Sequence, residues 1–187
     1  MGALYYSTTI SLDGYVADAD GDFQWSGPDD AVFAVHLARL AGVSTEVLGR
    51  KTFALMQYWE DFTGDANSTA DEVEFARGWR GIDKVVVSST LTRADLGAIR
   101  ARLVPELTLA ELRRIVDDAP GAVEIFGPTT AAAAIRAGMI DDFHLFVVPK
   151  VVGGGLRALP DDVRLDLRLV EQQVFDNGTL YLHYQPR

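Results

Sequence analysis

Residues 121–137, GAVEIFGPTTAAAAIRA, carry the pattern that decides the fold class. The stretch Gly121–Phe126 is mostly apolar and predicts a short buried strand. The glycine and proline that follow end the strand, and proline is favoured in the first turn of a helix. The alanine-rich stretch Pro128–Ala137 predicts that helix. A strand that leads directly into a helix is the repeating unit of α/β proteins with a parallel sheet.

The same alternation of strand and helix signals extends over most of the chain. Further strands are predicted at Leu4–Ile10, Thr45–Leu48, Lys84–Ser88, Ala98–Val104 and Ile140–Val148. Further helices are predicted from Pro28 to Leu40, from Arg50 to Tyr58, from Thr69 to Trp79 and from Thr108 to Ala119. Thr69 and Thr108 each stand three residues before a glutamate, which is the capping-box spacing.

Two segments depart from this alternation. Ser11–Gly27 is rich in aspartate and glycine and predicts a long irregular loop, and loops of this length are usually functional or mobile. Near the C-terminus, Leu165–Phe175 and Thr179–Tyr184 flank an Asn177-Gly178 pair, the strongest short-range signal of a β-hairpin. We therefore predict one domain over residues 1–187. It is a three-layer α/β/α sandwich with a mostly parallel eight-stranded sheet and a C-terminal antiparallel hairpin.

Composition and charge exclude several classes of protein. Of the 187 residues 48% are hydrophobic, which rules out a disordered chain. The absence of cysteine excludes disulfides, zinc fingers and thiol catalysis, and suits a reducing cytoplasm. A net charge of −10 would repel nucleic acid. The first residues resemble no signal peptide, and no apolar run approaches the ~20 residues of a membrane span, so no membrane partner is expected.

Small, hydroxylated and basic residues follow three of the predicted strands. Gly49-Arg50-Lys51-Thr52 follows the second, Ser88-Ser89-Thr90 follows the third with Arg93 close behind, and Gly127-Pro128-Thr129-Thr130 follows the fifth. Ligands of open α/β sheets bind at the carboxyl ends of parallel strands. Together these residues predict a phosphate-binding site, although each group alone also fits an ordinary turn or helix cap.

The chemistry of this site favours a phosphorylated dinucleotide. Arg50 and Lys51, with Ser88 and Ser89, have the charge and the donors to bind a 2′-phosphate. Gly127 and the helix start after it could bind a pyrophosphate. No Gly-x-Gly-x-x-Gly fingerprint follows a strand, which argues against an ordinary Rossmann site.

Several motifs in order give the chain a family resemblance. They are Ser11-Leu12-Asp13-Gly14-Tyr15-Val16-Ala17, Gly21-Asp22-Phe23-Gln24-Trp25, Leu48-Gly49-Arg50-Lys51-Thr52-Phe53, Lys84–Leu91, Ala137–Phe143 and Pro149–Gly155. The chain resembles the dihydrofolate reductase superfamily, in particular the branch similar to the reductase domain of bacterial riboflavin biosynthesis. The resemblance covers nearly the whole chain, and implies the fold predicted above and NADPH as the cofactor.

The resemblance also implies roles for individual residues. The end of the first strand would lie beside the nicotinamide, which nominates Thr8 and Thr9. The candidate cofactor-binding residues are then Thr8, Thr9, Gly49, Arg50, Lys51, Thr52, Ser88, Ser89, Thr90, Arg93, Gly127, Pro128, Thr129 and Thr130. Dihydrofolate reductases have a cis peptide bond in a Gly-Gly pair where this chain has Gly127-Pro128. We therefore expect the Gly127–Pro128 bond to be cis.

The substrate side is less sharply defined. Trp25-Ser26-Gly27-Pro28-Asp29-Asp30 resembles the Trp-x-x-Pro-x-Asp stretch of dihydrofolate reductases, which nominates Asp30 as the catalytic acid. A carboxylate at a helix start is also a common partner of the helix dipole without a catalytic role. Trp25, Trp59 and Phe62 are candidates for lining the substrate cleft, and ordinary core packing is the alternative.

The sequence thus predicts an NADPH-dependent reductase acting on a pterin-like or ribosylamino-pyrimidine-like heterocycle. The competing hypotheses are a module that senses or sequesters NADPH without turnover, and reduction of folate itself. The resemblance implies a possible homodimer. No metal is expected, because His36, His144 and His183 are far apart in the sequence and match no metal-ligand spacing.

Overall fold

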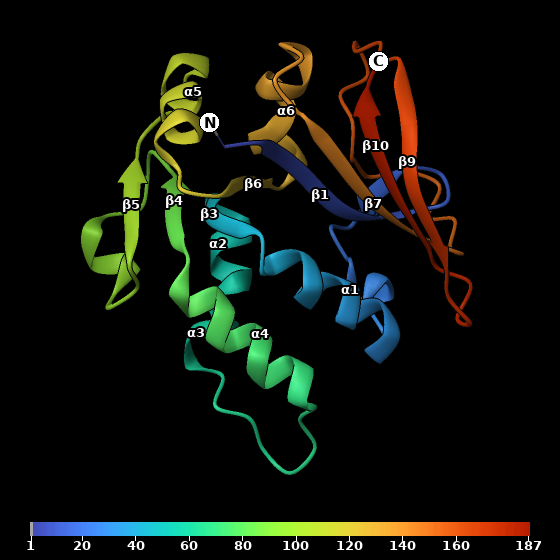
Figure 1. The fold of residues 1–187 in the computed structure, drawn as a ribbon, viewed down its shortest axis with the longest axis horizontal. Coiled ribbons are helices and arrows are strands. Elements are labelled where there is room, and N and C mark those ends of the chain that lie inside the picture. The colour runs from blue at the N-terminus through green and yellow to red at the C-terminus, as the bar shows by residue number, and fades with distance from the viewer. Residues whose placement is uncertain (1) are drawn as a thin grey trace.

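A computed structural model describes residues 2–187, and its centre is one eight-stranded sheet (Figure 1). Across the sheet the order is β5 (Ala101–Val104), β4 (Asp83–Val87), β3 (Val43–Gly49), β6 (Ala122–Phe126), β1 (Leu4–Ser11), β7 (Asp142–Val148), β10 (Leu180–Pro186) and β9 (Leu167–Val174). The first six strands are parallel, whereas β10 pairs antiparallel with both β7 and β9. The predicted mostly parallel sheet with a C-terminal antiparallel hairpin is therefore confirmed.

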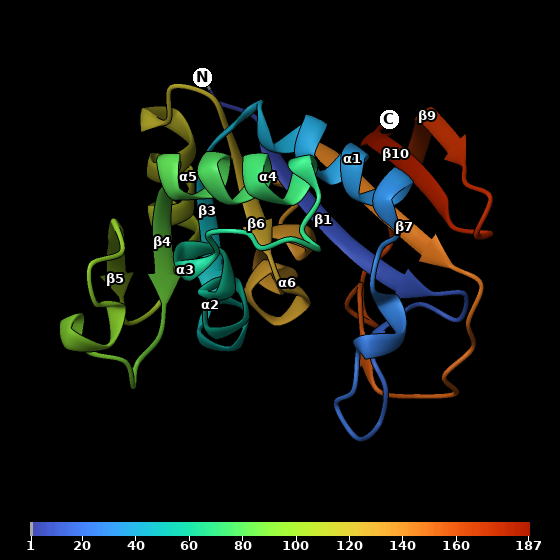
Figure 2. The same cartoon turned by 90° about the horizontal axis from the view of Figure 1, so that it is seen from below.

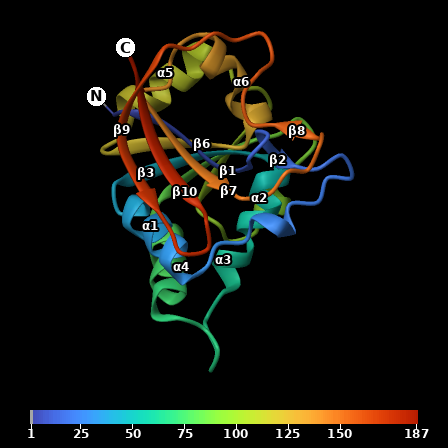
Figure 3. The same cartoon turned by 90° about the vertical axis from the view of Figure 1, so that its right-hand side faces the viewer.

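Helices cover both faces of the sheet, as the predicted three-layer sandwich requires. On one face lie α1 (Asp30–Leu40), α2 (Arg50–Met56), α3 (Tyr58–Asp61) and α4 (Ala70–Gly81), and on the other lie α5 (Leu109–Asp118) and α6 (Pro128–Arg136) (Figure 3). Side chains alternate between the two cores along each strand. Val47 packs with residues of α5 and α6, whereas the next residue, Leu48, packs with residues of α1, α2 and α4.

The starts of the helices show how local chemistry sets their boundaries. The Thr69–Glu72 capping box is formed as predicted, with Thr69 N donating to the Glu72 carboxylate at 2.8 Å. The prediction that Pro28 lies in the first turn of α1 is wrong. The Asp29 carboxylate accepts a hydrogen bond from Val32 N at 2.9 Å, so Asp29 is the N-cap and Pro28 precedes it.

The segment Ser11–Gly27 is more ordered than the predicted irregular loop. It contains β2 (Tyr15–Ala17) and the 3-10 turn η1 (Gln24–Ser26), and β2 pairs with β8 (Leu156–Arg157). The Asp13 carboxylate accepts hydrogen bonds from the backbone N–H groups of Val152 and Gly153 at 3.2 and 2.8 Å. These contacts fasten the segment to the glycine-rich stretch after β7.

The last short element is η2 (Arg93–Leu96), between β4 and β5. None of the helices found in residues 2–187 combines the length and the apolar character that crossing a membrane requires. In Figure 2 the N-terminus lies at the top, and the arrowheads of β1, β4, β5 and β7 point to the lower side of the picture. The carboxyl ends of the parallel strands therefore share one edge, where the candidate site lies.

Candidate functional site

Three of the predicted site segments are neighbours at the carboxyl edge of the sheet. In the parallel ladders Gly49 of β3 pairs with Val87 of β4, and Leu48 pairs with Phe126 of β6. The residues that follow these strands therefore leave the sheet side by side. The convergence expected from the sequence is realised for the groups after β3, β4 and β6.

The segments after β3 and β6 are in direct contact through their glycines and threonines. A Cβ atom at Gly127 would lie 2.8 Å from Thr52 Oγ1, and a Cβ atom at Gly49 would collide with Thr130 Oγ1. Both positions therefore need glycine for the two loops to approach this closely. The backbone of these two glycines therefore carries no side chain and lies beside the hydroxyl groups of Thr52 and Thr130, near the start of α6.

The expectation of a cis peptide bond between Gly127 and Pro128 is wrong, because this bond is trans. Gly127 has φ of 99° and ψ of 127°, a conformation that a residue with a side chain rarely adopts. The chain turns from β6 into α6 through this glycine, and Pro128 occupies the first helical position, where its fixed φ fits.

In the turn after β4, some of the polar groups form hydrogen bonds with one another. Ser88 is buried, and its Oγ accepts hydrogen bonds from Thr90 N at 3.2 Å and Leu91 N at 3.0 Å. This is the local capping role that a serine at a strand end often has. Ser89 and the side of Thr90 that faces solvent are exposed next to it.

The positive charge of the site is supplied by two of the three predicted cations. Arg50 and Lys51 are exposed at the start of α2, directly after β3. Arg93 lies elsewhere, because its guanidinium donates to the backbone oxygen of Ala101, the first residue of β5, at 3.2 Å. It is thereby directed towards the amino end of an edge strand and away from Arg50.

Thr8 and Thr9 lie on opposite faces of β1. Thr8 is buried on the same face as Tyr6, which packs with residues of α6. Thr9 is half-buried on the other face, which α1 covers, and pairs with Phe146 of β7. The side chains of the two predicted nicotinamide neighbours therefore point to opposite sides of the sheet.

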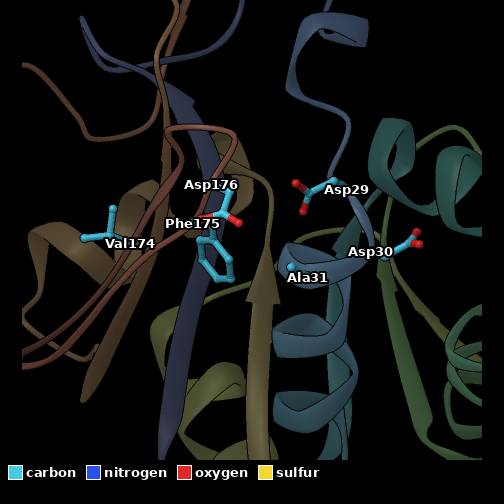
Figure 4. A pocket seen from close by; sticks show the side chains of 6 residues that line it. All are labelled: Asp29, Asp30, Ala31, Val174, Phe175 and Asp176. Carbon is cyan, nitrogen blue, oxygen red and sulfur yellow. The ribbon is translucent and has the colours of Figure 1, made fainter.

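A cavity of about 590 Å³ lies between the start of α1 and the β9–β10 turn. Asp29, Asp30 and Asp176 contribute to its lining (Figure 4). Figure 4 shows the Asp29 side chain on the side that faces Asp176, whereas the Asp30 carboxylate points away from the turn. Because Asp29 caps α1, Asp30 is the carboxylate at this helix start that remains free of a capping role.

Trp59 and Phe62 belong to an aromatic cluster between α1, α3 and α4. Their ring centroids are 5.3 Å apart, and Trp59 also contacts Phe33 of α1 at 5.7 Å and Phe75 of α4 at 4.8 Å. Residues three apart lie on one face of a helix, so Asp30 and Phe33 share a side of α1. The predicted acid and these two aromatic residues therefore lie on the same side of α1.

Trp25 is held locally in η1. Its indole Nε1 donates to the backbone oxygen of Asp22 at 3.0 Å, and the ring is half-buried. Within residues 2–187, Trp25 forms no aromatic pair with the Trp59–Phe62 cluster. Trp59 and Phe62 are therefore in contact, whereas Trp25 is fixed separately within η1.

A row of charged side chains beneath α1 and α4 was missed by the sequence analysis. Glu46, Lys84 and Glu124 occupy adjacent positions on β3, β4 and β6, and all three are buried. Trp79 Nε1 donates to the Glu46 carboxylate at 2.7 Å, and Arg39 of α1 pairs with Glu124 at 3.4 Å. Charged residues inside otherwise apolar strands were the available signal.

The environment of Glu46 perturbs its ionisation. Burial, reinforced by the nearby charge of Glu124, raises the pKa of Glu46 to about 8, although the Trp79 hydrogen bond and Lys84 act in the opposite direction. The carboxyl group is therefore protonated over most of the neutral range. This row lies on the strand bodies and not at the carboxyl edge, so it does not contact the candidate site.

Known proteins with similar sequences or structures agree with this fold. The model of the RibD C-terminal domain family matches residues 3–181. An uncharacterised protein of Bacillus subtilis, YyaP, is 26% identical over 94% of this chain and 90% of its own length.

Two solved structures also align over almost the whole chain. One is a putative riboflavin biosynthesis protein from Shewanella sp. PV-4, with a TM-score of 0.77, 20% identity and 99% of each chain covered. The other is the dihydrofolate reductase of Enterococcus faecalis complexed with NADP(H) and RAB-propyl, with a TM-score of 0.64 and 18% identity over 100% of this chain and 97% of that one. At these identities the likeness concerns the fold.

Proposed function

Because the chain belongs to the RibD C-terminal domain family, we propose that it is an NADPH-dependent reductase of a small heterocycle, pterin-like or ribosylamino-pyrimidine-like. The observation that carries the proposal is the contact between the Gly49–Thr52 and Gly127–Thr130 segments at the carboxyl edge of the sheet. The substrate class is suggested by the solved dihydrofolate reductase and riboflavin biosynthesis relatives, which share the fold.

The residues at this edge fit the phosphate groups of NADPH. The first amides of a helix have no intrahelical partner, so the Thr129 and Thr130 N–H groups at the start of α6 suit a pyrophosphate. Pro128 supplies no N–H there. The Arg50 guanidinium and the Lys51 ammonium are exposed beside this backbone and suit a 2′-phosphate.

NADPH, when bound, supplies the hydride, and the protein supplies orientation and protons. The Trp59–Phe62 cluster offers an apolar surface on which a flat ring can lie. Asp30, on the same side of α1, is the candidate acid for the substrate. The segment that contains β2 and η1 is fastened near the same edge and would exclude water from the reacting groups.

Selectivity for the 2′-phosphate tests the cofactor site. In Arg50→Ala/Lys51→Ala we expect the affinity for NADPH to fall at least about tenfold, with little change for NADH, because only NADPH carries the second phosphate. Arg93→Ala is the matched control and should bind both cofactors as the wild type does, because Arg93 is bonded to Ala101. Calorimetric titration of each variant gives the affinities. A wild-type protein with no affinity for NADPH would remove the basis of the proposal.

A module that binds NADPH without turnover is the second candidate. Its support is the position of Asp30, which is exposed and whose carboxylate points away from the β9–β10 turn across the cavity. Loss of NADPH absorbance with dihydrofolate or a panel of pyrimidines and pterins distinguishes the two. Turnover that Asp30→Asn reduces favours the reductase, and tight methotrexate binding lost in Asp30→Asn favours folate reduction. Binding without turnover across the panel favours the module.

We also propose that the protein acts in the cytoplasm as a homodimer. The chain contains no cysteine, as suits a reducing compartment. The surface that would pair two copies is the part of the sheet beyond α6, where β7, β10 and β9 present apolar side chains.

A further inference from the structure

A second group of chemically active side chains lies far from the candidate cofactor site. Asp142 and His144 stand two residues apart on β7, and His183 of β10 pairs directly with His144. Alternate residues of a strand share a face, and directly opposed residues of two strands share it too. All three side chains therefore project from the face of the sheet that α1 covers. The sequence showed three scattered histidines, and the strand order brings two of them together.

The three side chains are close enough together to bind one metal ion after small side-chain movements. One imidazole nitrogen of each histidine and one carboxylate oxygen of Asp142 lie within 4.8 Å of one another. His183 Nε2 is 2.6 Å from Asp142 Oδ1, and the two imidazole rings are stacked with centroids 4.3 Å apart. Ligand atoms bound at about 2.0–2.2 Å in a tetrahedral arrangement lie about 3.3–3.6 Å from one another. The hydrogen-bonded pair of His183 and Asp142 would therefore move slightly apart and any longer separation would shorten, which side-chain rotation can supply.

His144 provides an independent sign that this group can bind a ligand. The residue is only 6% exposed, and its Nε2 atom is buried without a hydrogen-bond partner within residues 2–187. Buried polar atoms are almost always paired, so an unpaired one requires an explanation. With the proton on Nδ1, donated to the Tyr181 hydroxyl oxygen 2.9 Å away, the Nε2 lone pair is free.

The surroundings resemble the outer shell of a metal centre. A ligating histidine usually has its second nitrogen hydrogen-bonded, which orients the ring, and Tyr181 does this for His144. Gln185 Nε2 donates to Asp142 Oδ1 at 2.9 Å and orients the carboxylate. The positive charge of Arg39, which bonds to Ser7 on the neighbouring strand, is offset by its pairing with Glu124.

We propose that Asp142, His144 and His183 bind one divalent transition-metal ion of the zinc class. Two imidazole nitrogens and one carboxylate oxygen form a ligand set that Zn²⁺ accepts, with further positions left for water. The ion would join β7 to β10 and so attach the C-terminal hairpin to the parallel strands. The site lies at the start of β7, at the opposite end of this strand from the cofactor edge, and does not depend on the proposed reductase activity.

Titration with Zn²⁺ alone tests the site. Chelator-treated protein without a histidine tag should bind one ion per chain by calorimetry, and its Tm should rise because only the folded state offers the site. Co²⁺ should give the visible absorption of a bound low-symmetry ion, whereas Mg²⁺ should neither bind comparably nor raise the Tm. Absence of Zn²⁺ binding by the wild type would overturn the proposal.

Matched variants assign the ligands. Asp142→Asn and His183→Gln should each weaken Zn²⁺ binding at least about tenfold and lose the rise in Tm, because each removes one of three ligands. Asp141→Asn makes the same chemical change at the neighbouring residue, whose carboxylate accepts from Leu4 N, and should bind Zn²⁺ as the wild type does. Equal binding by wild type, Asp142→Asn and His183→Gln would contradict the assignment. If one variant fails to fold, the other variant and the Co²⁺ spectrum of the wild type still test whether these residues bind the ion.

Discussion

At the scale of single residues, Glu46 places an ionisable group inside the sheet core. Its side chain faces Trp79 of α4, Lys84 of β4, Glu124 of β6 and Arg39 of α1. Because burial raises its pKa from 4.5 to about 8, the folded protein retains a proton that the unfolded chain releases between these values. The free energy of unfolding is therefore highest, as far as Glu46 contributes to it, below pH 4.5, and it falls as the pH rises from 4.5 to about 8.

Glu46→Gln should remove this pH dependence. The amide oxygen can still accept the Trp79 hydrogen bond, and no charge has to be buried, so the variant should exceed the wild type in stability above pH 8 by a few kcal/mol. The measurement is the free energy of unfolding in urea at several pH values, taken as the difference between variant and wild type. Glu106→Gln, on an exposed loop, is the control and should leave the profile unchanged. A difference independent of pH would contradict the assigned protonation.

Gly127 shows how one residue fixes the geometry of the candidate site. Gly127→Ala should destabilise the protein by about 2–4 kcal/mol, because a side chain is strained at φ of 99° and its Cβ would press on Thr52. Gly138→Ala is the matched control: φ there is 63°, and no atom lies within 4 Å of the added Cβ, so only a smaller strain remains. Chemical denaturation compares the two. An equal loss of unfolding free energy in both variants would mean that the contact with Thr52 does not affect stability.

At the scale of elements, Arg80 connects α4 to the aromatic cluster. Its guanidinium donates hydrogen bonds to the backbone oxygens of Trp59 and Phe62 at 3.0 and 2.9 Å. Arg80 thereby caps the short helix α3. A four-residue helix is not stable alone, so its position depends on such contacts.

Arg80→Ala should therefore lower stability by about 1–3 kcal/mol, because half-buried carbonyl groups lose their donor. If the cluster holds substrate, KM should rise more than kcat falls. Arg77→Ala on the same helix is the control, since within residues 2–187 Arg77 pairs with exposed Glu74 alone and its loss should cost under about 1 kcal/mol. Thermal unfolding of the three proteins provides the comparison. Equal effects of the two substitutions would show that Arg80 does not position α3.

The elements themselves were largely predictable, because their signals are local. The strand 121–126, the helix after it and the Thr69 cap depend on neighbours in the sequence, and the structure confirms them. The position of a long side chain does not depend on its immediate neighbours: the Arg93 guanidinium bonds to the backbone oxygen of Ala101, beyond the turn that follows it. The pairing of His144 with His183 arises only from the place of β10 beside β7, which no sequence spacing encodes.

At the scale of the whole molecule, the helix layers do not cover all of the sheet. Beyond α6 the outer strands present Leu145, Val147, Leu180, Leu182 and Val174 on one face, as the ladder register requires. The first four are partly exposed and Val174 is 73% exposed. An uncovered apolar sheet face of this kind favours contact with a second copy, and a two-fold axis would pair it with itself.

Pairing of the β9 edges of two copies is a less suitable way to form the proposed dimer. The ladder between β9 and β10 shifts register between His183 and Tyr184, and such a bulge disturbs the outer edge of a strand. Arg168 and Glu171 also place charges along it. We therefore expect the face, and not the edge, to form the interface.

Val174→Lys and Gln173→Lys distinguish the uncovered apolar face from the opposite face of the sheet, since the two neighbouring residues point to opposite faces of β9. Burial of one valine contributes about 1.5–3 kcal/mol, so Val174→Lys should weaken dimerisation at least about tenfold. Gln173→Lys, on the α1 side, should leave it unchanged. Sedimentation equilibrium gives the dissociation constants, and circular dichroism confirms folding. A wild type that is monomeric at high micromolar concentration, or equal effects of both variants, would show that this face does not pair two copies.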